Sequence, residues 1–220
     1  MFGAKVEIAL REKGLPFELE MVAFSQAQGY HPRHPEVLRV NPKRQVPVLL
    51  GDGVELFDST QIFEYLEHAF PGSALRPALW PASVVARAQA RQLEHASDEV
   101  FFPHVVKLMG LRANPDPVHK PEWIQAREGI EAYYDKMDGR LAGREWFAGE
   151  YSYADIAFYM AQFFAARHTV PMAASHRNLL AWRGRMAERP AVRRVIDAMA
   201  DYLRSIEYFV PDYGLPGAGA

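Results

Sequence analysis

The first absence to note in this 220-residue chain is cysteine, of which it has none. Disulfide bonds, thiolate zinc sites and cysteine nucleophiles are therefore excluded. His31 and His34 lie close together, but two histidines without a third ligand at a motif spacing are a weak metal signal. We expect no bound metal.

Long apolar runs and an excess of one charge are also absent. No run approaches the length that spans a bilayer, and the start has no signal-peptide pattern. The formal net charge is −2 with both signs interspersed, which provides no electrostatic footprint for nucleic acid or anionic lipid. With 49% apolar and 24% charged residues, the composition is that of an ordinary globular chain with one large or two modest domains. We expect a cytoplasmic location, without nucleic-acid or membrane partners.

What the chain does have is an informative segment over residues 41–62, NPKRQVPVLLGDGVELFDSTQI. Val46-Pro47 enters an apolar strand, a Gly-Asp-Gly turn leads to a second strand, and Asp58-Ser59 opens an apolar helix. Only X-Pro bonds become cis at low cost, and a cis bond here would turn the backbone N–H and C=O of Val46 outward, toward an extended peptide. The free N–H groups at the start of the helix suit a carboxylate. The segment predicts a site for a small acidic peptide, although a strand start at Pro47 and a helix cap at Asp58 are alternative, purely structural roles.

This pattern resembles the glutathione-binding half of the glutathione transferase family, in which Asn-Pro-x-x-(Gln/Lys)-Val-Pro-x-Leu precedes a hairpin and (Glu/Asp)-Ser opens a helix. The resemblance implies that Gln45 and Val46 contact the cysteinyl-glycine part of glutathione, with Pro47 in cis. It implies that Asp58 and Ser59 hold the γ-glutamyl end. A loop histidine or glutamine contacts the glycyl end in some relatives, so His34 joins the candidate glutathione-binding residues.

The pattern of apolar residues predicts an α+β N-terminal domain over residues 1–72, which resembles a thioredoxin-like domain with one part missing. The expected elements are a helix at 5–13 that stops at Gly14, a strand at 16–22, a loop at 23–34, a short helix at 35–40, two strands and a helix at 59–70. A linker rich in proline and small residues follows at 73–82.

Only helical periodicity follows the linker, so we expect an all-α C-terminal domain at 83–205. Its expected helices are 83–111, bent or interrupted at Pro103, then 122–141, a buried helix opened by Ser152, and a last helix with Pro190 in its first turn. The tail at 206–220 is rich in proline and glycine, and such termini are mostly loosely ordered. Its Tyr208, Phe209 and Tyr213 could instead fold back over a pocket.

The second domain carries the family resemblance as well. Ser152-x-x-Asp155 resembles the capping box that opens the buried helix of the family's second domain, a structural and not a catalytic feature. The resemblance covers about residues 4–205. It also implies a twofold homodimer through the first domain's last helix and the second domain's long helix, with polar contacts at Thr60, Glu64, Arg87 and Arg91.

A thiol-activating residue is missing from the expected place. Family members begin with a strand that ends in a catalytic Ser, Tyr or Cys, which lowers the pKa of the glutathione thiol, since the thiolate is the nucleophile. Aligned on Val6, that position falls at or before Met1, and we expect that the true start lies upstream. Ser25 is a poor substitute, because a loop serine needs no catalytic explanation. The catalytic residue is therefore unassigned.

The resemblance implies an enzyme that transfers the glutathione thiolate onto a hydrophobic electrophile. The electrophile would lie against Phe101, Phe102 and Val105, which would serve equally well as helix core. For His95 and His104, on the same long helix, surface or core roles are favoured. The alternatives are a non-catalytic binding or scaffold protein of the same fold, and a specialised glutathione-dependent dehalogenase, etherase or isomerase.

Overall fold

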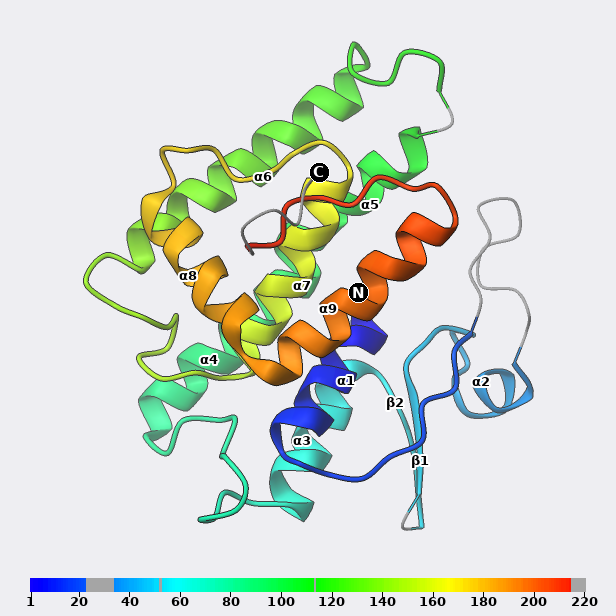
Figure 1. The fold of residues 1–220 in the computed structure, drawn as a ribbon, viewed down its shortest axis with the longest axis vertical. Helices are drawn as coiled ribbons and strands as arrows, with labels where there is room; N and C mark the ends of the chain where they lie inside the picture. The colour runs from blue at the N-terminus through cyan, green and yellow to red at the C-terminus, as the bar shows by residue number, and fades with distance from the viewer. Residues whose placement is uncertain (23–33, 52, 113, 215–220) are drawn as a thin grey trace. The chain divides into compact units, whose positions relative to one another are not determined.

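The computed structural model describes residues 1–22, 34–51, 53–112 and 114–214. The chain divides into two compact units, Met1–Ala78 and Leu79–Ala220. The described residues of the first unit form both helices and strands, and those of the second form helices (Figure 1).

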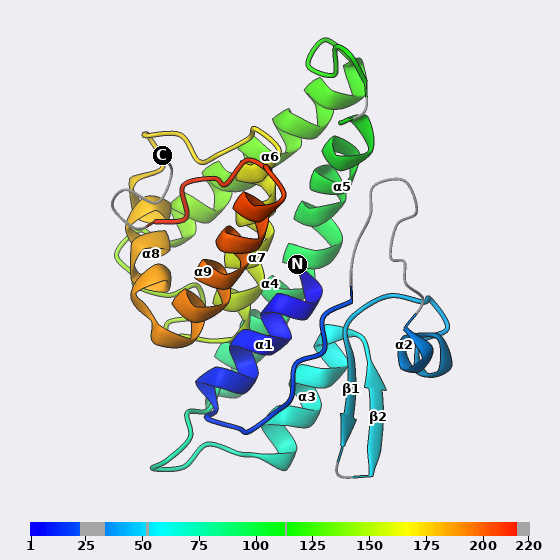
Figure 2. The same ribbon diagram turned by 45° about the vertical axis from the view of Figure 1, so that its right-hand side comes forward.

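The described residues of the N-terminal unit form one hairpin and three helices. Its elements are α1 (Phe2–Glu12), α2 (Pro35–Val40), β1 (Val48–Gly51), β2 (Val54–Phe57) and α3 (Ser59–Ala69). The strands pair antiparallel, with Val48 opposite Phe57 and Gly51 opposite Val54. In Figure 2, α1 and α3 lie on one side of the hairpin and α2 on the other. The apolar side chains of α1 and α3 that form the core are Val6, Ile8, Ala9, Leu10, Ile62, Phe63 and Leu66.

A buried lysine ties the elements of this unit together. Lys13 directly follows α1, has no exposed surface, and donates hydrogen bonds to the carbonyls of Phe70 at 3.0 Å and Pro77 at 3.2 Å. Its ammonium group also forms an ion pair with Glu67 of α3 at 2.8 Å. Gly14 ends the helix with φ at +61°, a left-handed conformation that glycine adopts without a side-chain clash.

The predicted strand at 16–22 is wrong, because residues 15–22 run without regular structure. Alternation of apolar side chains indicates a strand only if one face is covered, yet Leu19 is 51% and Met21 75% exposed. A strand also needs a neighbour for its backbone hydrogen bonds. In the described part of the chain, the only strand ladder is the one between β1 and β2, and it does not include residues 15–22.

The C-terminal unit is a helical bundle around one buried helix. Its helices are α4 (Val84–Ala96), α5 (Phe102–Leu111), α6 (Pro121–Arg140), α7 (Tyr153–Arg167), α8 (Arg177–Glu188) and α9 (Pro190–Ser205). Only Phe164 and Arg167 of α7 are not buried, which agrees with the apolar composition of this helix on all sides. Phe158 is at the centre, with its ring 5.2 Å from Phe101 and 5.6 Å from Trp182.

The expected interruption near Pro103 is a π-helical turn. Residues Ser97–Phe101 form this turn between α4 and α5, and Pro103 lies in the first turn of α5. Proline has no N–H and is tolerated in the first turn of a helix, where an N–H would have no partner. The turn places Phe101 in the core, with no exposed surface.

The predicted capping box of Ser152 and Asp155 is present at the start of α7. Asp155 is fully buried, and its carboxylate accepts hydrogen bonds from Ser152 N at 3.0 Å, Trp182 Nε1 at 3.0 Å and Phe147 N at 3.3 Å. Burial raises the pKa of Asp155 to about 6, while these donors act in the opposite direction because they stabilise the charged form. The carboxylate therefore joins α7, α8 and the segment before α7.

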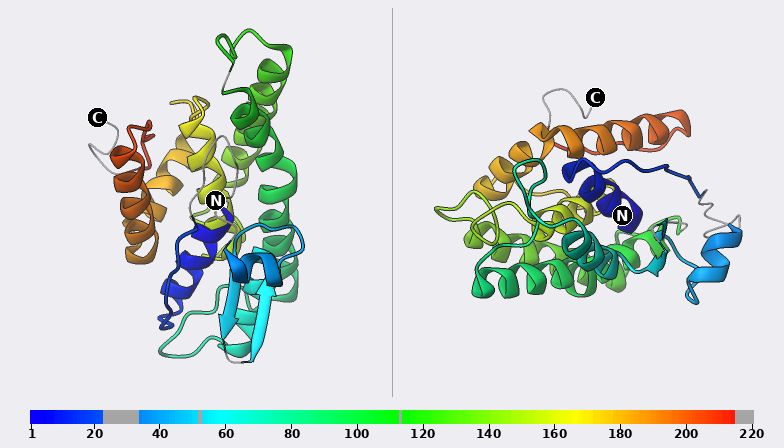
Figure 3. Two further views of the ribbon diagram at one scale, coloured as in Figure 1. Left: turned by 90° about the vertical axis from the view of Figure 1, so that its right-hand side faces the viewer. Right: turned by 90° about the horizontal axis from the view of Figure 1, so that it is seen from below.

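The first part of the tail is ordered, against the prediction of a loose terminus. Tyr213 is 5% exposed, its hydroxyl bonds Asp197 of α9 at 3.1 Å, and its carbonyl accepts from Tyr159 of α7 at 2.8 Å. Arg183 of α8 donates to the carboxylate of Asp212 at 2.7 Å. Figures 1 and 3 show the segment after α9 turning back along this helix. Residues 215–220 lie outside the described residues.

The close contact between α5 and α6 provides a test of packing. A Cβ added at Gly129 of α6 would lie 2.6 and 2.7 Å from the ring nitrogens of His104, whereas Gly139 on the same helix faces open space. Gly129→Ala should therefore lower the free energy of unfolding by about 1–3 kcal/mol through overpacking. Gly139→Ala should leave it unchanged or raise it by less than about 1 kcal/mol. Urea denaturation of both variants checks this, and equal stabilities would contradict the packing.

Candidate functional site

The register of the hairpin brings the two halves of the sequence motif to one end of the sheet. Val48 pairs with Phe57, so Pro47, which precedes β1, and Asp58, which follows β2, leave the hairpin at the same end. Residues directly opposite in an antiparallel pair have Cα atoms about 5 Å apart. Two segments separated by ten residues of sequence thus lie next to each other in space.

The Val46–Pro47 peptide bond is cis, which confirms the expected conformation. In the part of the chain that the structure describes, neither the backbone N–H nor the C=O of Val46 has a hydrogen-bond partner. An unpaired backbone N–H and C=O are the groups to which an extended peptide adds as a strand does.

Asn41 holds the loop before this edge, a role that the sequence analysis did not assign. It is 4% exposed, its Nδ2 donates to the carbonyl of Gln45 at 2.6 Å, and its Oδ1 accepts from Lys43 N at 2.9 Å. Asparagine side chains commonly close turns in this way, so the Asn-Pro dipeptide was the available signal. The bond to Gln45 fixes the chain just before Val46.

Asp58 and Ser59 form the N-terminus of α3. Asp58 has a φ of +72°, and its Oδ1 accepts from Thr60 N at 3.0 Å and Gln61 N at 3.3 Å. Its backbone carbonyl accepts from Ile62 N, so the first-turn N–H groups after Ser59 are satisfied within the protein. The donors of Ser59, its N–H and hydroxyl, make no hydrogen bond within the described residues. Asp58 is exposed and Ser59 is buried.

His34 has a partner of its own. The Nε2 of His34 lies 2.6 Å from Glu20 Oε1. In the chain, His34 directly precedes the first residue of α2. Among the described residues, no hydrogen bond or ion pair joins His34 to Val46 or Asp58. Ser25 and His31 lie outside the described residues.

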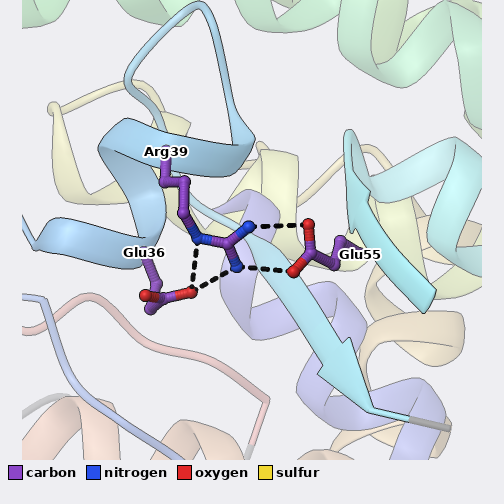
Figure 4. Close-up of polar contacts among 3 residues, drawn as sticks. All are labelled: Glu36, Arg39 and Glu55. Atoms are coloured by element: carbon purple, nitrogen blue, oxygen red, sulfur yellow. Dashed lines mark hydrogen bonds and ion pairs between the residues drawn. The ribbon is translucent and has the colours of Figure 1, made fainter. Parts of the chain in front are cut away.

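An arginine bridge attaches α2 to the hairpin, another feature that the sequence analysis did not identify (Figure 4). Arg39 donates to Glu36 Oε2 through Nε at 3.1 Å and to both carboxylate oxygens of Glu55 on β2, at 2.7 and 2.6 Å. These hydrogen bonds raise the pKa of Arg39 and lower the pKa of Glu55. Glu36 and Arg39 are three residues apart on a helix, a spacing from which their ion pair could have been predicted. The sequence contains no such signal for Glu55, because the fold brings β2 next to α2.

The residues considered for a second substrate have structural roles in the helical unit. Phe101 and Val105 have no exposed surface, and Phe101 packs on the rings of Tyr133 and Tyr134 at 5.3 and 5.4 Å. His104 packs on Gly129, and burial lowers its pKa, with Lys107 adding to the effect. His95 is exposed on α4.

Among the described residues, no group of three or more His, Asp or Glu side chains could hold a metal ion. In the same residues, no helix combines the length and apolar character that crossing a membrane requires.

The fold and the site's geometry define a two-domain protein with a small α/β unit that presents an open backbone edge, followed by a helical unit. Comparison with known proteins identifies the class. Residues 1–69 match the family model for the glutathione S-transferase N-terminal domain, and residues 89–190 match the model for the C-terminal domain. The chain belongs to the glutathione S-transferase family.

Individual relatives agree with this assignment. The chain is 31% identical to glutathione S-transferase GstB of Escherichia coli K12 over 87% of this chain and 91% of that protein. It is 26% identical to the probable glutathione S-transferase parC of Nicotiana tabacum over 98% of this chain and 93% of that protein. A crystal structure of a Burkholderia graminis glutathione transferase, with two glutathione molecules bound per subunit, has a TM-score of 0.75 and 25% identity over 90% of this chain and 84% of that one. The predicted fold class, a thioredoxin-like domain followed by an all-helical domain, is confirmed.

Proposed function

We propose that this protein binds glutathione along the Val46 edge and transfers its thiolate onto a hydrophobic electrophile. One observation carries the proposal: the N–H and C=O of Val46 and the donors of Ser59, none of which has a partner among the described residues, lie at the same end of the hairpin. The family supports glutathione-dependent transferase activity. The proposal includes a homodimer and a cytoplasmic location, as in the family resemblance.

The dimensions of glutathione fit this edge. A three-residue peptide in extended form spans about 10 Å, and the two motif halves are about 5 Å apart across the strands. The cysteinyl part would pair with the backbone of Val46, next to Pro47. The γ-glutamyl end would then reach α3, with Gln45 along the other half of the tripeptide.

The two charges of the γ-glutamyl end match the two residues at the start of α3. Its carboxylate would accept from Ser59 N–H and the Ser59 hydroxyl, with the positive end of the α3 dipole behind them. Its ammonium group would lie against the exposed Asp58 carboxylate, whose Oδ2 is not used by the cap. His34 would reach the glycyl carboxylate only by exchanging its bond to Glu20.

Ser59→Ala should weaken glutathione binding about 10-fold or more, since a hydrogen bond to a charged group is worth about 1.5–3 kcal/mol. Asp58→Asn should also weaken it, while the helix cap survives because asparagine caps helices as well as aspartate does. Calorimetric titration with glutathione measures both. The matched control is Glu18→Gln, an exposed carboxylate of the same unit that makes no hydrogen bond among the described residues.

Unchanged affinity in both site variants would refute the assignment of Asp58 and Ser59. An assay with an aromatic halide then separates three of the alternatives. A glutathione conjugate supports the transferase, release of halide without a stable conjugate supports a dehalogenase, and binding without turnover supports a binding or scaffold protein.

A further inference from the structure

Two arginines of the helical unit converge on one aromatic ring. The guanidinium carbon of Arg112 lies 4.3 Å from the ring centre of Tyr208, and that of Arg167 lies 5.2 Å from the same centre. Arg112 directly follows α5, Arg167 is the last residue of α7, and Tyr208 comes after α9. Two segments thus place a positive charge each on the ring of a residue from a third segment.

Among the described residues, no carboxylate is paired with either of these arginines. Within the described residues, neither Arg112 nor Arg167 forms an ion pair or a side-chain hydrogen bond, and the Nε of Arg167 is buried without a partner. Arg183 of the same unit, in contrast, is paired with Asp212. Burial lowers the pKa of Arg167, and Arg112 lowers it further by repulsion between like charges.

A buried histidine, His168, directly follows Arg167 in the chain. We group it with the two arginines and the ring, and we call Arg112, Arg167, His168 and Tyr208 the Arg112–Arg167 cluster. His168 is 8% exposed, and its Nε2 is buried without a hydrogen-bond partner. Burial lowers its pKa to about 4, and Arg167 and Arg112 add to the shift. A buried polar atom without a partner usually costs about 1–3 kcal/mol, so such groups tend to mark function.

Helix dipoles alone do not explain the cluster. Cations are favoured at helix C-termini, which accounts for Arg112 and Arg167 one at a time. The helix dipoles do not account for the position of both guanidinium groups over one ring, where each raises the electrostatic energy of the other.

Hydrogen bonds hold the chain on both sides of Tyr208. Tyr208 N donates to the carbonyl of Leu203 at the end of α9 at 2.8 Å. Beyond it, Asp212 and Tyr213 are anchored to α8, α7 and α9 through the contacts described above. Arg112 is exposed and Tyr208 half-buried, so the cluster is open to solvent.

We propose that Arg112, Arg167, His168 and Tyr208 form a binding site for an oxyanion, the carboxylate, phosphate or sulfate group of a small acidic ligand. A guanidinium group offers paired N–H donors that match two oxygens of such an anion. The anion would remove the repulsion between the arginines and give the Nε2 of His168 an acceptor or a charge to interact with. The site lies in the helical unit and does not depend on the glutathione site proposed above.

The test uses the full chain and inorganic phosphate, with sulfate and acetate as separate arms and chloride at equal ionic strength as the reference. The ring resonances of His168 are followed by NMR during titration. We expect a saturable shift in the wild type and affinity at least about 10-fold weaker in Arg112→Gln/Arg167→Gln, because each lost charged hydrogen bond costs roughly that factor. Arg177→Gln/Arg193→Gln removes the same charge from exposed positions elsewhere in the unit and should bind as the wild type does.

Phosphate should also raise the pH at which His168 titrates in the wild type, and not in the cluster variant. A response to phosphate and sulfate alone indicates a tetrahedral anion, and a response that includes acetate indicates a carboxylate site. Equal responses in the wild type and the cluster variant, or no saturable response to any of the three anions, would overturn the proposal.

Discussion

Asp155→Ala is expected to lower the free energy of unfolding by about 4 kcal/mol, since removing one partner from a buried charged network costs about 3–5 kcal/mol. The Asp155 carboxylate is the common acceptor of donors in three segments: Phe147 N, Ser152 N and Trp182 Nε1. Alanine leaves these buried donors without their acceptor. For a chain of this size, the expected fall in Tm is roughly 8 to 16 °C.

Chemical denaturation followed by circular dichroism measures this loss, and hydrogen exchange of the α7 amides assigns it to the helical unit. Asp201→Ala is the matched control, because Asp201 is 77% exposed and its one ion pair among the described residues is with Arg204 on the same helix. Its effect should stay within about 0.5 kcal/mol. Asp155→Asn should fall between the two, since its amide keeps one oxygen as acceptor. A loss below about 1 kcal/mol in Asp155→Ala would contradict the role of the carboxylate.

Lys13→Met is expected to destabilise the N-terminal unit by about 3 kcal/mol. Methionine fills a similar volume, so the loss comes from polar groups and not from a cavity. The carbonyls of Phe70 and Pro77 lose their donor, and the carboxylate of Glu67 loses this ion pair while only 14% exposed. Hydrogen exchange in α1 and α3, with thermal unfolding, measures the loss.

A double variant shows the source of the loss. Lys13→Met/Glu67→Gln should recover part of the stability, because the buried negative charge has been removed together with its partner. Lys43→Met, at an exposed lysine of the same unit, should have little effect. If Lys13→Met is as stable as the wild type, the contacts of Lys13 do not hold the unit together.

The motif residues illustrate what a sequence can specify locally. Pro47 is cis, as the family resemblance implied, and Ser152 with Asp155 caps α7, as predicted. Asp58 caps α3, which was the structural alternative given for this residue. Each of these features depends on interactions over a few residues of chain, so the sequence alone was sufficient. The predicted strand at 16–22 failed for the opposite reason, because pairing depends on a neighbour that a local pattern does not contain.

The tail shows the same limit. Its proline and glycine content predicted a loose terminus, yet Asp212 and Tyr213 are held by Arg183, Tyr159 and Asp197. These partners lie up to 54 residues away in sequence. Composition describes the entropy of a free chain, and it cannot register the distant hydrogen bonds that offset that entropy.

The sequence by itself determined the family, the order of the two domains, the cis proline and the helix caps, because each is encoded in contiguous residues. Only the tertiary structure decided which distant groups meet: Glu55 with Arg39, Trp182 with Asp155, and Arg112 with Arg167 over Tyr208. The physical reason is that charge, hydrogen bonding and burial act over a few ångströms of space. Residues far apart along the chain therefore acquire their roles only after folding has placed them in contact.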